Sequence, residues 1–341
     1  MKKFKKSKNN KNKLVISLGD PAGIGTEITL KALGSNYLNE NIEPLLVGCK
    51  NNIYQTYSKL LDCGINNIPD PKELEIIDIP LEKKIIPGII NKNTGAASFK
   101  WLFNATNILL EGKAKALVTA PISKIAWHWA GHHYAGQTEL LGKLSNRKTS
   151  MLFTAISPNN GWRFNTLLAT THIPLNTINN NLTKELIKHK LDTLLNFCSK
   201  FKEKPLIQIA GLNPHAGEEG QIGMEEQKLI IPILNEWKLN NPTIKVNGPV
   251  PPDTCWISAA NAWNSDSIEN YAPDGILAFY HDQGLIPVKL IAFDDAVNTT
   301  LGLPFVRTSP DHGTALDIAG TFKARETSMI AALNNAWILS Q

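Results

Sequence analysis

The sequence predicts an α/β protein with a largely parallel sheet, and three observations support this fold class. Short apolar stretches alternate with segments of helical periodicity along most of the 341 residues, as in β-α-β units. Several apolar stretches stop at a cluster of polar residues, as strands do at the functional edge of α/β enzymes. Hydrophobic residues make up 43% of the chain, enough for a sizeable core in one large or two ordinary domains.

The individual elements follow from the local pattern. Strands are expected over residues 14–19, 43–48, 116–123, 149–155, 164–175, 205–215 and 274–281. Helices are expected over residues 20–33, after a glycine-rich turn, and over 101–114, 182–201 and 223–237. The segment 182–201 carries an apolar stripe at helical spacing, which is typical of an amphipathic helix.

The N-terminal residues 1–13 are basic and polar and contain seven lysines. The net charge of +5 therefore becomes −2 for the rest of the chain (5 − 7), so a nucleic-acid-binding surface on the folded part is not indicated. We expect these residues to form a disordered, solvated tail. A specific anion-binding arm is the alternative.

The apolar runs and the cysteines indicate the cellular compartment of the protein. No apolar run is long enough to span a bilayer. The apolar stretch after the basic tail is too short for a signal peptide, and no small-residue cleavage site follows it. The four cysteines are scattered and form no C-x-x-C pair. We therefore expect a reduced, cytoplasmic protein with buried free thiols and no membrane partner.

Three histidines, His172, His215 and His281, each follow an apolar strand. The carboxyl ends of parallel strands lie along one edge of a sheet, so the polar clusters there are expected to converge. Three imidazoles on rigid elements suit a divalent metal with an open coordination position; a structural or exposed role for each is the alternative. Asp253 and Asp282 are candidates for further ligands, for groups that orient a ligand, or for cofactor contacts.

Acidic residues surround the second of these histidines, at Glu218, Glu219, Glu225 and Glu226. They could bind a hard cation. The simpler interpretation is that they occupy the N-terminal turn of the following helix, where negative charge is favoured. We adopt this second interpretation.

Two cationic residues follow the strand over 274–281. Lys289 lies in an apolar run that we interpret as a strand. Its alkyl side chain either extends to place the ammonium group at the surface or presents that group to a ligand. Arg307 stands at a strand-to-loop junction, where arginine suits bidentate binding of phosphate or carboxylate. A structural salt bridge to Asp311 or Asp317 is the alternative for Arg307.

A further candidate anion site lies in the stretch "GQTELLG". Gln137 and Thr138 begin a predicted helix, with Glu139 in its first turn. Amide and hydroxyl groups at a helix N-terminus form a natural anion site.

The glycine-rich stretch "GDPAGIGTE" does not match the known nucleotide-binding loops. Gly19, Gly23 and Gly25 are spaced G-x-x-x-G-x-G, unlike the dinucleotide fingerprint G-x-G-x-x-G. No Gly-Lys-Ser/Thr follows, which excludes a Walker A loop. From the residues alone we predict an α/β enzyme with a divalent metal and an anionic substrate, without a defined reaction.

Seven motifs together resemble the 4-hydroxythreonine-4-phosphate dehydrogenase family of vitamin B6 synthesis. The resemblance begins near residue 14, covers nearly the whole chain and preserves the family's order: "GDPAGIG", "TAPISK", "TTHIPL", "GLNPHAGEEGQIGMEE", "GPVPPDT", "YHDQGLIPVKL" and "AVNTTLGLPFVRTSPDHGTALDIAG". It implies two α/β subdomains with the site in a cleft, as in isocitrate and isopropylmalate dehydrogenases, and NAD bound without a Rossmann loop. We expect subdomains over 14–140 plus 290–341 and over 141–289.

The resemblance also implies roles for single residues. His172, His215 and His281 would bind a divalent metal, with His281 and Lys289 as the catalytic residues. The residues implied to contact the substrate are Gln137, Thr138, Lys289, Asn298 and Arg307. Asp253 and Asp282 match acidic positions near the metal or cofactor. Family members are homodimers, so the resemblance implies a site at the subunit interface.

The implied reaction is an NAD-dependent, metal-assisted oxidation of 4-phosphooxy-L-threonine. The product, 2-amino-3-oxo-4-phosphooxybutanoate, is a β-keto acid that decarboxylates to 3-amino-2-oxopropyl phosphate in pyridoxal 5'-phosphate biosynthesis. NADP is the alternative cofactor. Zinc or cobalt suits three imidazoles, while added carboxylates and substrate oxygens suit magnesium or manganese.

The chain departs from the family pattern in two places. The motif "G-H-T-E" reads "GQTE" here, so Gln137 replaces a histidine and cannot titrate near neutrality. The segment between Asp253 and Asp274 is longer than in the family. A dehydrogenase of another phosphorylated acid, such as 4-phospho-threonate or 4-phospho-erythronate, is one alternative, and a non-catalytic metal- or ligand-binding protein is another.

Overall fold

The computed structural model describes residues 13–267 and 271–341, which form two compact units. The first comprises the described residues within Met1–Thr149 and Val297–Gln341, and the second comprises those within Ser150–Ala296. The expected basic tail lies outside the described residues, except for Lys13, which begins the first strand. The expected boundary after residue 289 falls inside a helix of the second unit, α10 (His281–Ala292).

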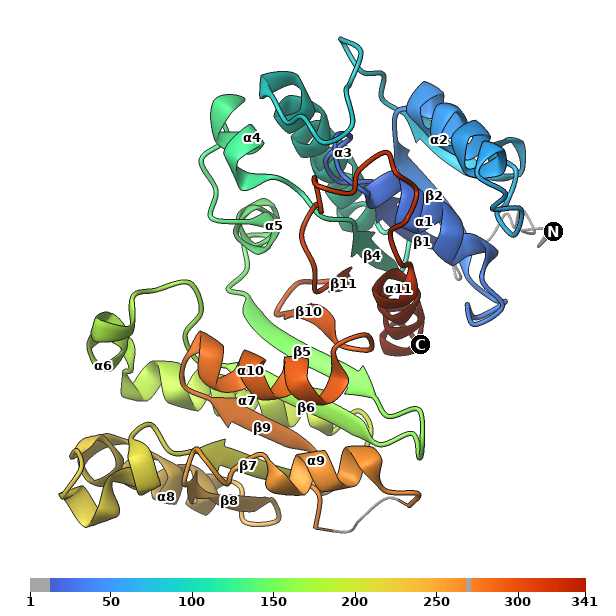
Figure 1. The fold of residues 1–341 in the computed structure, drawn as a ribbon. Coiled ribbons are helices and arrows are strands. Elements are labelled where there is room, and N and C mark those ends of the chain that lie inside the picture. Colours follow the sequence, from blue (N-terminus) through green and yellow to red (C-terminus); the bar gives the residue numbers. More distant parts are fainter. Residues whose placement is uncertain (1–12, 268–270) are drawn as a thin grey trace. The chain divides into compact units, whose positions relative to one another are not determined.

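The first unit contains six strands in the order β3-β2-β1-β4-β11-β10 (Figure 1). All neighbours in this series are parallel except β11 and β10, which are antiparallel. The strands are β1 (Lys13–Ser17), β2 (Glu43–Gly48), β3 (Glu75–Asp78), β4 (Ala116–Thr119), β10 (Val297–Leu301) and β11 (Val306–Pro310).

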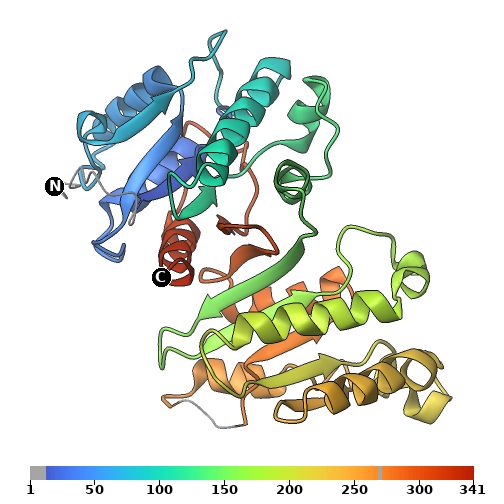
Figure 2. The same cartoon turned by 180° about the vertical axis from the view of Figure 1, so that it is seen from behind.

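Helices cover both faces of these strands, and α3 and α11 come to the front in opposite views (Figures 1 and 2). The helices of this unit are α1 (Gly25–Gly34), α2 (Lys50–Asp62), α3 (Lys92–Leu110), α4 (Lys124–Trp129), α5 (Gln137–Ser145), α11 (Thr327–Leu339) and a short 3-10 turn, η2 (Pro71–Glu73). Apolar side chains of the strands, α1, α3 and α11 form one core. The predicted helix over 101–114 is therefore the second half of a longer helix, because α3 already begins at a capping box on Asn91.

The second unit contains five strands in the order β5-β6-β9-β7-β8. They are β5 (Ser150–Ile156), β6 (Arg163–Leu168), β7 (Leu206–Ala210), β8 (Lys245–Val250) and β9 (Gly275–Ala278), and only the β5–β6 pair is antiparallel. The helical elements are η3 (Leu175–Thr177), α6 (Ile178–Asn181), α7 (Lys184–Cys198), η4 (Pro214–Gly220), η5 (Glu226–Ile230), α8 (Ile231–Asn240), α9 (Ile257–Asn264) and α10. Helix α10 lies in front of the sheet in Figure 1, and α7 lies in front of it in Figure 2.

The predicted α/β class is confirmed, and so is the convergence of polar clusters within each unit. In the second unit β6, β9, β7 and β8 are parallel neighbours, so the clusters after them share one edge. In the first unit β1 and β4 are parallel neighbours, which places "GDPAG" beside "TAPIS". Among the described residues, none of the helices combines the length and apolar character needed to cross a membrane.

One predicted element is wrong. The apolar run around Lys289, interpreted as a strand, forms part of helix α10. A Cβ at Gly284 would lie 2.5 Å from Leu168 Cδ2, so the missing side chain lets α10 pack closely on the sheet. The short apolar run was ambiguous because periodicity does not separate a buried strand from a buried helix segment.

The glycine-rich turn after β1 serves packing. Gly19 has φ +72°, and a Cβ at Gly25 would lie 2.2 Å from the main-chain oxygen of Leu18. Asp20 closes the turn, since its carboxylate accepts hydrogen bonds from the Ala22 amide (2.9 Å) and the Thr94 hydroxyl (3.3 Å). Burial raises the pKa of Asp20 to about 6.

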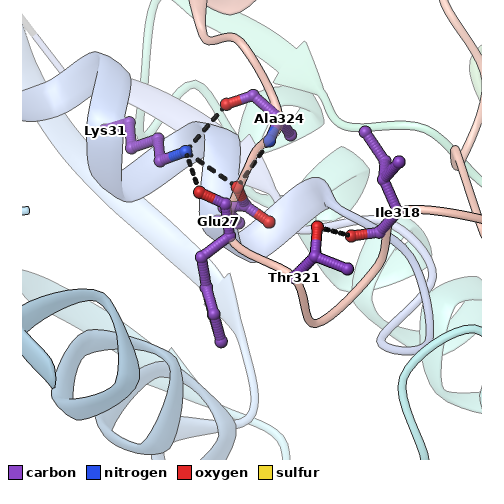
Figure 3. A network of polar contacts seen from close by, with 6 residues as sticks. Glu27, Lys31, Ile318, Thr321 and Ala324 are labelled. Carbon is purple, nitrogen blue, oxygen red and sulfur yellow. Dashed lines mark hydrogen bonds and ion pairs between the residues drawn. The ribbon is translucent and has the colours of Figure 1, made fainter. Parts of the chain in front are cut away.

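A buried ion pair holds the segment after β11 against α1 (Figure 3). Lys31 Nζ lies 2.8 Å from Glu27 Oε1, and both side chains are less than a tenth exposed. Lys31 also donates to the main-chain oxygens of Phe322 and Ala324, and Glu27 accepts from the Ala324 amide. Because every charge is satisfied, this network fixes the loop that follows the strand carrying Arg307.

Candidate functional site

The three predicted metal ligands lie along the shared strand edge of the second unit. His172 follows β6, His281 begins α10 and is separated from the end of β9 by two residues, and His215 lies in η4 after β7. Asp253 follows β8, the last strand of the series. The edge therefore carries one candidate ligand or acidic group for each of its four parallel strands.

His281 and His172 face each other at this edge. Their ring centroids are 5.6 Å apart with an interplanar angle of 44°. With metal–nitrogen distances of about 2.0–2.1 Å, two imidazoles on one tetrahedral ion have centroids roughly 5 Å apart, so this pair fits a shared metal. Asp282 Oδ1 lies 2.7 Å from His281 Nδ1, so Nε2 is the ring nitrogen that this contact leaves for another partner.

His215 is presented by an unusual backbone turn. Residues 215–219 all have positive φ, between 41° and 84°, and only one of them is a glycine. Left-handed backbone costs about 1–2 kcal/mol for each non-glycine residue, so surrounding contacts must hold this turn. Glu218 Oε1 lies 2.5 Å from His215 Nδ1, and its hydrogen bond and charge, with a contribution from Asp253, raise the pKa of His215.

Glu226 anchors the chain that leads into this turn. Its carboxylate is fully buried and accepts hydrogen bonds from the amides of Leu212 and Asn213 and from the Asn213 side chain, all at 2.8 Å. Glu226 begins the π-helical segment η5 and Glu225 directly precedes it, as the helix interpretation of these acidic residues expected. Glu218 instead pairs with a histidine, which the sequence did not indicate.

Replacing Glu226 with glutamine is expected to lower the free energy of unfolding by about 1.5–3 kcal/mol, because an amide cannot accept all three hydrogen bonds of a buried carboxylate. Glu219 is exposed, and its side chain makes no hydrogen bond to any other described residue, so Glu219→Gln is the matched control. Urea denaturation of both variants measures the effect. Equal stability of Glu226→Gln and the wild type would show that the carboxylate does not hold the turn.

The three histidines do not form one preassembled metal site in this chain. Among the described residues, no group of three His, Cys, Asp or Glu side chains is placed to hold a metal ion. The structure brings together His172, His281 and Asp282 on one side, and His215, Glu218 and Asp253 on the other.

Lys289 lies on α10 and not on a strand, which corrects the sequence interpretation. It follows His281 by eight residues, a rise of about 12 Å along the helix axis. Its Nζ lies 6.0 Å from the ring centroid of Phe293. Lys289 and His281 are therefore two turns apart on one helix.

Arg307, on β11, is a buried cation in the first unit. Its side chain is 3% exposed, and burial lowers its pKa to about 10. The guanidinium donates to two hydroxyls: Nε and Nη2 contact Thr119 Oγ1 at 3.2 and 2.6 Å, and Nη1 contacts Thr300 Oγ1 at 3.0 Å. Both partners in these contacts are neutral hydroxyl groups. A buried arginine held by neutral groups retains its attraction for an anion.

Asn298 shares a face of the β10–β11 hairpin with Arg307. Thr300 pairs with Arg307 in the antiparallel register, and Asn298 is two residues from Thr300, so their side chains point the same way. Asn298 Oδ1 is buried and has no hydrogen-bond partner among the described residues. Such an unpaired atom requires an explanation, and a ligand group is one.

The predicted helix at Gln137 is confirmed as α5, with Glu139 in its first turn. The N-cap residue is Gly136, which provides no side-chain hydrogen bond to the first amides. These amides, together with the Thr138 hydroxyl, are therefore suited to an anion. Gln137 Nε2 donates to the main-chain oxygen of Ala120 over 3.1 Å, which brings α5 to the end of β4, beside Thr119 and Arg307.

Comparison with known proteins identifies the family. A family model described as "Pyridoxal phosphate biosynthetic protein PdxA" matches residues 40–336. The chain belongs to the PdxA family. This confirms the resemblance inferred from the seven motifs.

Three similar proteins illustrate the sequence identity and coverage between this chain and its relatives. A 4-hydroxythreonine-4-phosphate dehydrogenase of Synechococcus sp. (strain RCC307) is 55% identical over 325 residues, 95% of this chain and 98% of the relative. A D-threonate 4-phosphate dehydrogenase of Pectobacterium atrosepticum is 36% identical, over 96% of this chain and 99% of the relative. A crystal structure of 4-hydroxythreonine-4-phosphate dehydrogenase from Klebsiella pneumoniae superimposes with a TM-score of 0.79 at 33% identity, covering 98% of this chain and 100% of the other.

Several supporting contacts of the candidate site were not predicted from the sequence. Thr119 and Thr300 hold the Arg307 guanidinium, Glu218 binds His215, and Glu226 anchors the preceding chain. Thr119 and Thr300 lie inside quoted motifs, but nothing local marks them as partners of an arginine 188 and 7 residues away. Only the sheet order brings β4, β11 and β10 together.

Proposed function

We propose that this protein is an NAD-dependent, metal-assisted dehydrogenase of 4-phosphooxy-L-threonine in pyridoxal 5'-phosphate biosynthesis. The product would be 2-amino-3-oxo-4-phosphooxybutanoate, which decarboxylates to 3-amino-2-oxopropyl phosphate. The name of the Synechococcus relative supports this activity. The structural observation that carries the proposal is Arg307, a buried cation whose guanidinium donates to two neutral hydroxyls. We further propose that it works in the cytoplasm, with NADP as the alternative cofactor.

The chain's own residues have distinct tasks in this proposal. Arg307, Asn298 and the N-terminal turn of α5 with Thr138 bind the anionic groups of the substrate. Fixing these groups orients the carbon that loses hydride. Lys289 either contacts an anionic group or transfers a proton.

The residues at the strand edge of the second unit fit a divalent metal. His172 and His281 would bind it through ring nitrogens, Asp282 would fix the ring of His281, and His215 with Glu218 behind it would provide a third imidazole. Zinc, cobalt, magnesium and manganese are the candidates. When bound, the metal supplies Lewis acidity at the substrate's hydroxyl oxygen.

The proposal includes a homodimer with the site at the subunit interface. Helix α10, which carries His281 and Lys289, and its C-cap residue Phe293 expose large apolar side chains at helical spacing: Ile286 is 59% exposed, Leu290 81% and Phe293 62%. Such a stripe on a monomer's surface is typical of a protein–protein contact. A partner on this face would lie next to the two residues proposed as catalytic.

Replacing Leu290 with glutamate is therefore expected to convert the dimer to a monomer and to lower turnover at least about tenfold, because a charge would be buried in an apolar contact. Leu239 on α8 is also 81% exposed, so Leu239→Glu is the matched control. Light scattering after gel filtration measures the mass of both variants. A dimeric, active Leu290→Glu variant would contradict the assignment of this face.

The activity is tested by following NADH formation from NAD and 4-phosphooxy-L-threonine. Protein stripped with a chelator and reloaded with each of the four metals is compared with untreated protein. Turnover that requires metal supports the proposal. Turnover that the chelator does not change would support the dehydrogenase activity but contradict the role of the metal.

One alternative substrate has an observation in its favour. The Pectobacterium relative is named a D-threonate 4-phosphate dehydrogenase, so 4-phospho-threonate and 4-phospho-erythronate belong in the same assay. Faster turnover of either would change the substrate assignment. Absence of turnover with all three would favour a non-catalytic ligand-binding protein.

A further inference from the structure

The side-chain amide of Gln137 has a defined orientation. Its Nε2 donates a hydrogen bond to the main-chain oxygen of Ala120. A carbonyl oxygen only accepts hydrogen bonds, so the NH2 group must face Ala120 and the amide oxygen must point elsewhere. That oxygen, Oε1, is buried and has no hydrogen-bond partner among the described residues. Gln137 thus offers a ligand an acceptor and no positive charge.

The side chain of Gln137 reaches the same strand end as the buried guanidinium. Ala120 directly follows Thr119, whose hydroxyl accepts two hydrogen bonds from Arg307. Glu139, two residues after Gln137, exerts an electrostatic effect on Arg307. Gln137 and Arg307 therefore hold consecutive residues at the end of β4 and flank one site within the first unit.

The two groups require different partners. Arg307 carries a positive charge and five N–H donors, which suit a phosphate or carboxylate. An amide oxygen is a partial negative charge, which a phosphate dianion would meet unfavourably and a hydroxyl or ammonium group would satisfy. A buried acceptor that its ligand leaves unpaired weakens binding.

We propose that Gln137 determines substrate specificity by accepting a hydrogen bond from a hydroxyl or ammonium group of the substrate whose anionic group Arg307 binds. This inference rests on the proposed function, because it concerns the same phosphorylated substrate. It assigns recognition of the donor group to Gln137 and recognition of the phosphate to other residues.

Titration calorimetry on the full-length, metal-loaded protein tests this division of roles. The probes are inorganic phosphate, 4-phosphooxybutanoate, which has neither hydroxyl nor ammonium, 4-phospho-threonate, and 4-phosphooxy-L-threonine. Gln137→Met removes the acceptor at similar volume, and Gln55→Met on α2, an exposed glutamine, is the matched control.

Gln137→Met is expected to raise the dissociation constant of 4-phosphooxy-L-threonine at least about tenfold and to leave those of phosphate and 4-phosphooxybutanoate unchanged. An equal loss for 4-phospho-threonate shows that a hydroxyl can satisfy the acceptor, and a loss confined to the amino acid identifies the ammonium as the donor. Unchanged phosphate binding also shows that the variant is folded.

Two results would overturn the inference: weaker binding of phosphate in proportion to the other ligands, or no change for any ligand. Wild-type protein that binds none of the four probes would overturn it as well. The calorimetric comparison requires no turnover, so it tests this inference independently of catalysis. The proposed function fails if no NADH is formed in the activity assay.

Discussion

Replacing Arg307 with methionine is expected to lower kcat/KM at least about a hundredfold while leaving the melting temperature unchanged or higher. Loss of charge-assisted hydrogen bonds to a desolvated anion costs about 2–5 kcal/mol, which sets the size of the first effect. The second effect follows from burial. The guanidinium is 3% exposed and contacts two hydroxyls, so the folded protein bears a desolvation cost that methionine removes.

The two readouts together separate a binding role from a structural one. A structural arginine would lower the melting temperature on removal, whereas an arginine kept for an anion would not. Added phosphate should raise the melting temperature of the wild type and not of Arg307→Met, because only the folded site binds it. Steady-state kinetics and thermal unfolding measure these quantities.

Arg163 provides the matched control. Burial lowers its pKa to about 10 as well, and it donates to Thr154 Oγ1 and lies 4.2 Å from the ring centroid of Phe201. Arg163→Met is expected to lower the melting temperature without a change in kcat/KM beyond about twofold. If Arg307→Met behaved like this control, Arg307 would be a structural residue.

Replacing His281 with alanine is expected to weaken metal binding at least about a hundredfold and to abolish measurable turnover. Removal of a group that only orients a metal ligand costs 10–100-fold in affinity, so loss of a ligand itself should cost about as much or more. Asp282→Asn keeps His281 and alters only the group that orients its ring. The metal affinity of this variant should therefore lie between those of the wild type and His281→Ala. Competition with a chromophoric chelator measures the affinity independently of activity.

A second pair of histidines in the protein controls for chance proximity. His128 and His133 have ring centroids 5.4 Å apart, close to the 5.6 Å of His172 and His281. His128 Nε2 lies 3.4 Å from a main-chain oxygen, of Tyr134, and not beside a carboxylate. His128→Ala should retain the metal affinity and turnover of the wild type. Equal losses in both variants would mean that the paired rings at the strand edge are not a specific site.

The fold and the candidate site were predictable from the sequence to different extents. Strands β2, β4, β5, β7 and β9 and helix α7 matched expectation because each combines a clear apolar pattern with flanking turn residues. Helix α10 was missed because its first turns, "HDQGLIPVKL", contain a glycine and a proline and no helical stripe strong enough to exclude a strand. The histidines at strand ends were found because parallel strands place their carboxyl ends together whatever their order.

The sequence by itself determined the α/β class, the polar strand ends and, through seven ordered motifs, the family. The tertiary structure alone decided which side chains support the predicted ones. Thr119 contacts Arg307, Glu226 anchors the chain that leads to His215, and Gln137 directs its amide oxygen away from Ala120. The reason is physical: periodicity and turn chemistry are local properties of the chain, whereas these contacts join residues 14 to 188 positions apart. Only strand order and helix packing bring such residues within hydrogen-bonding distance.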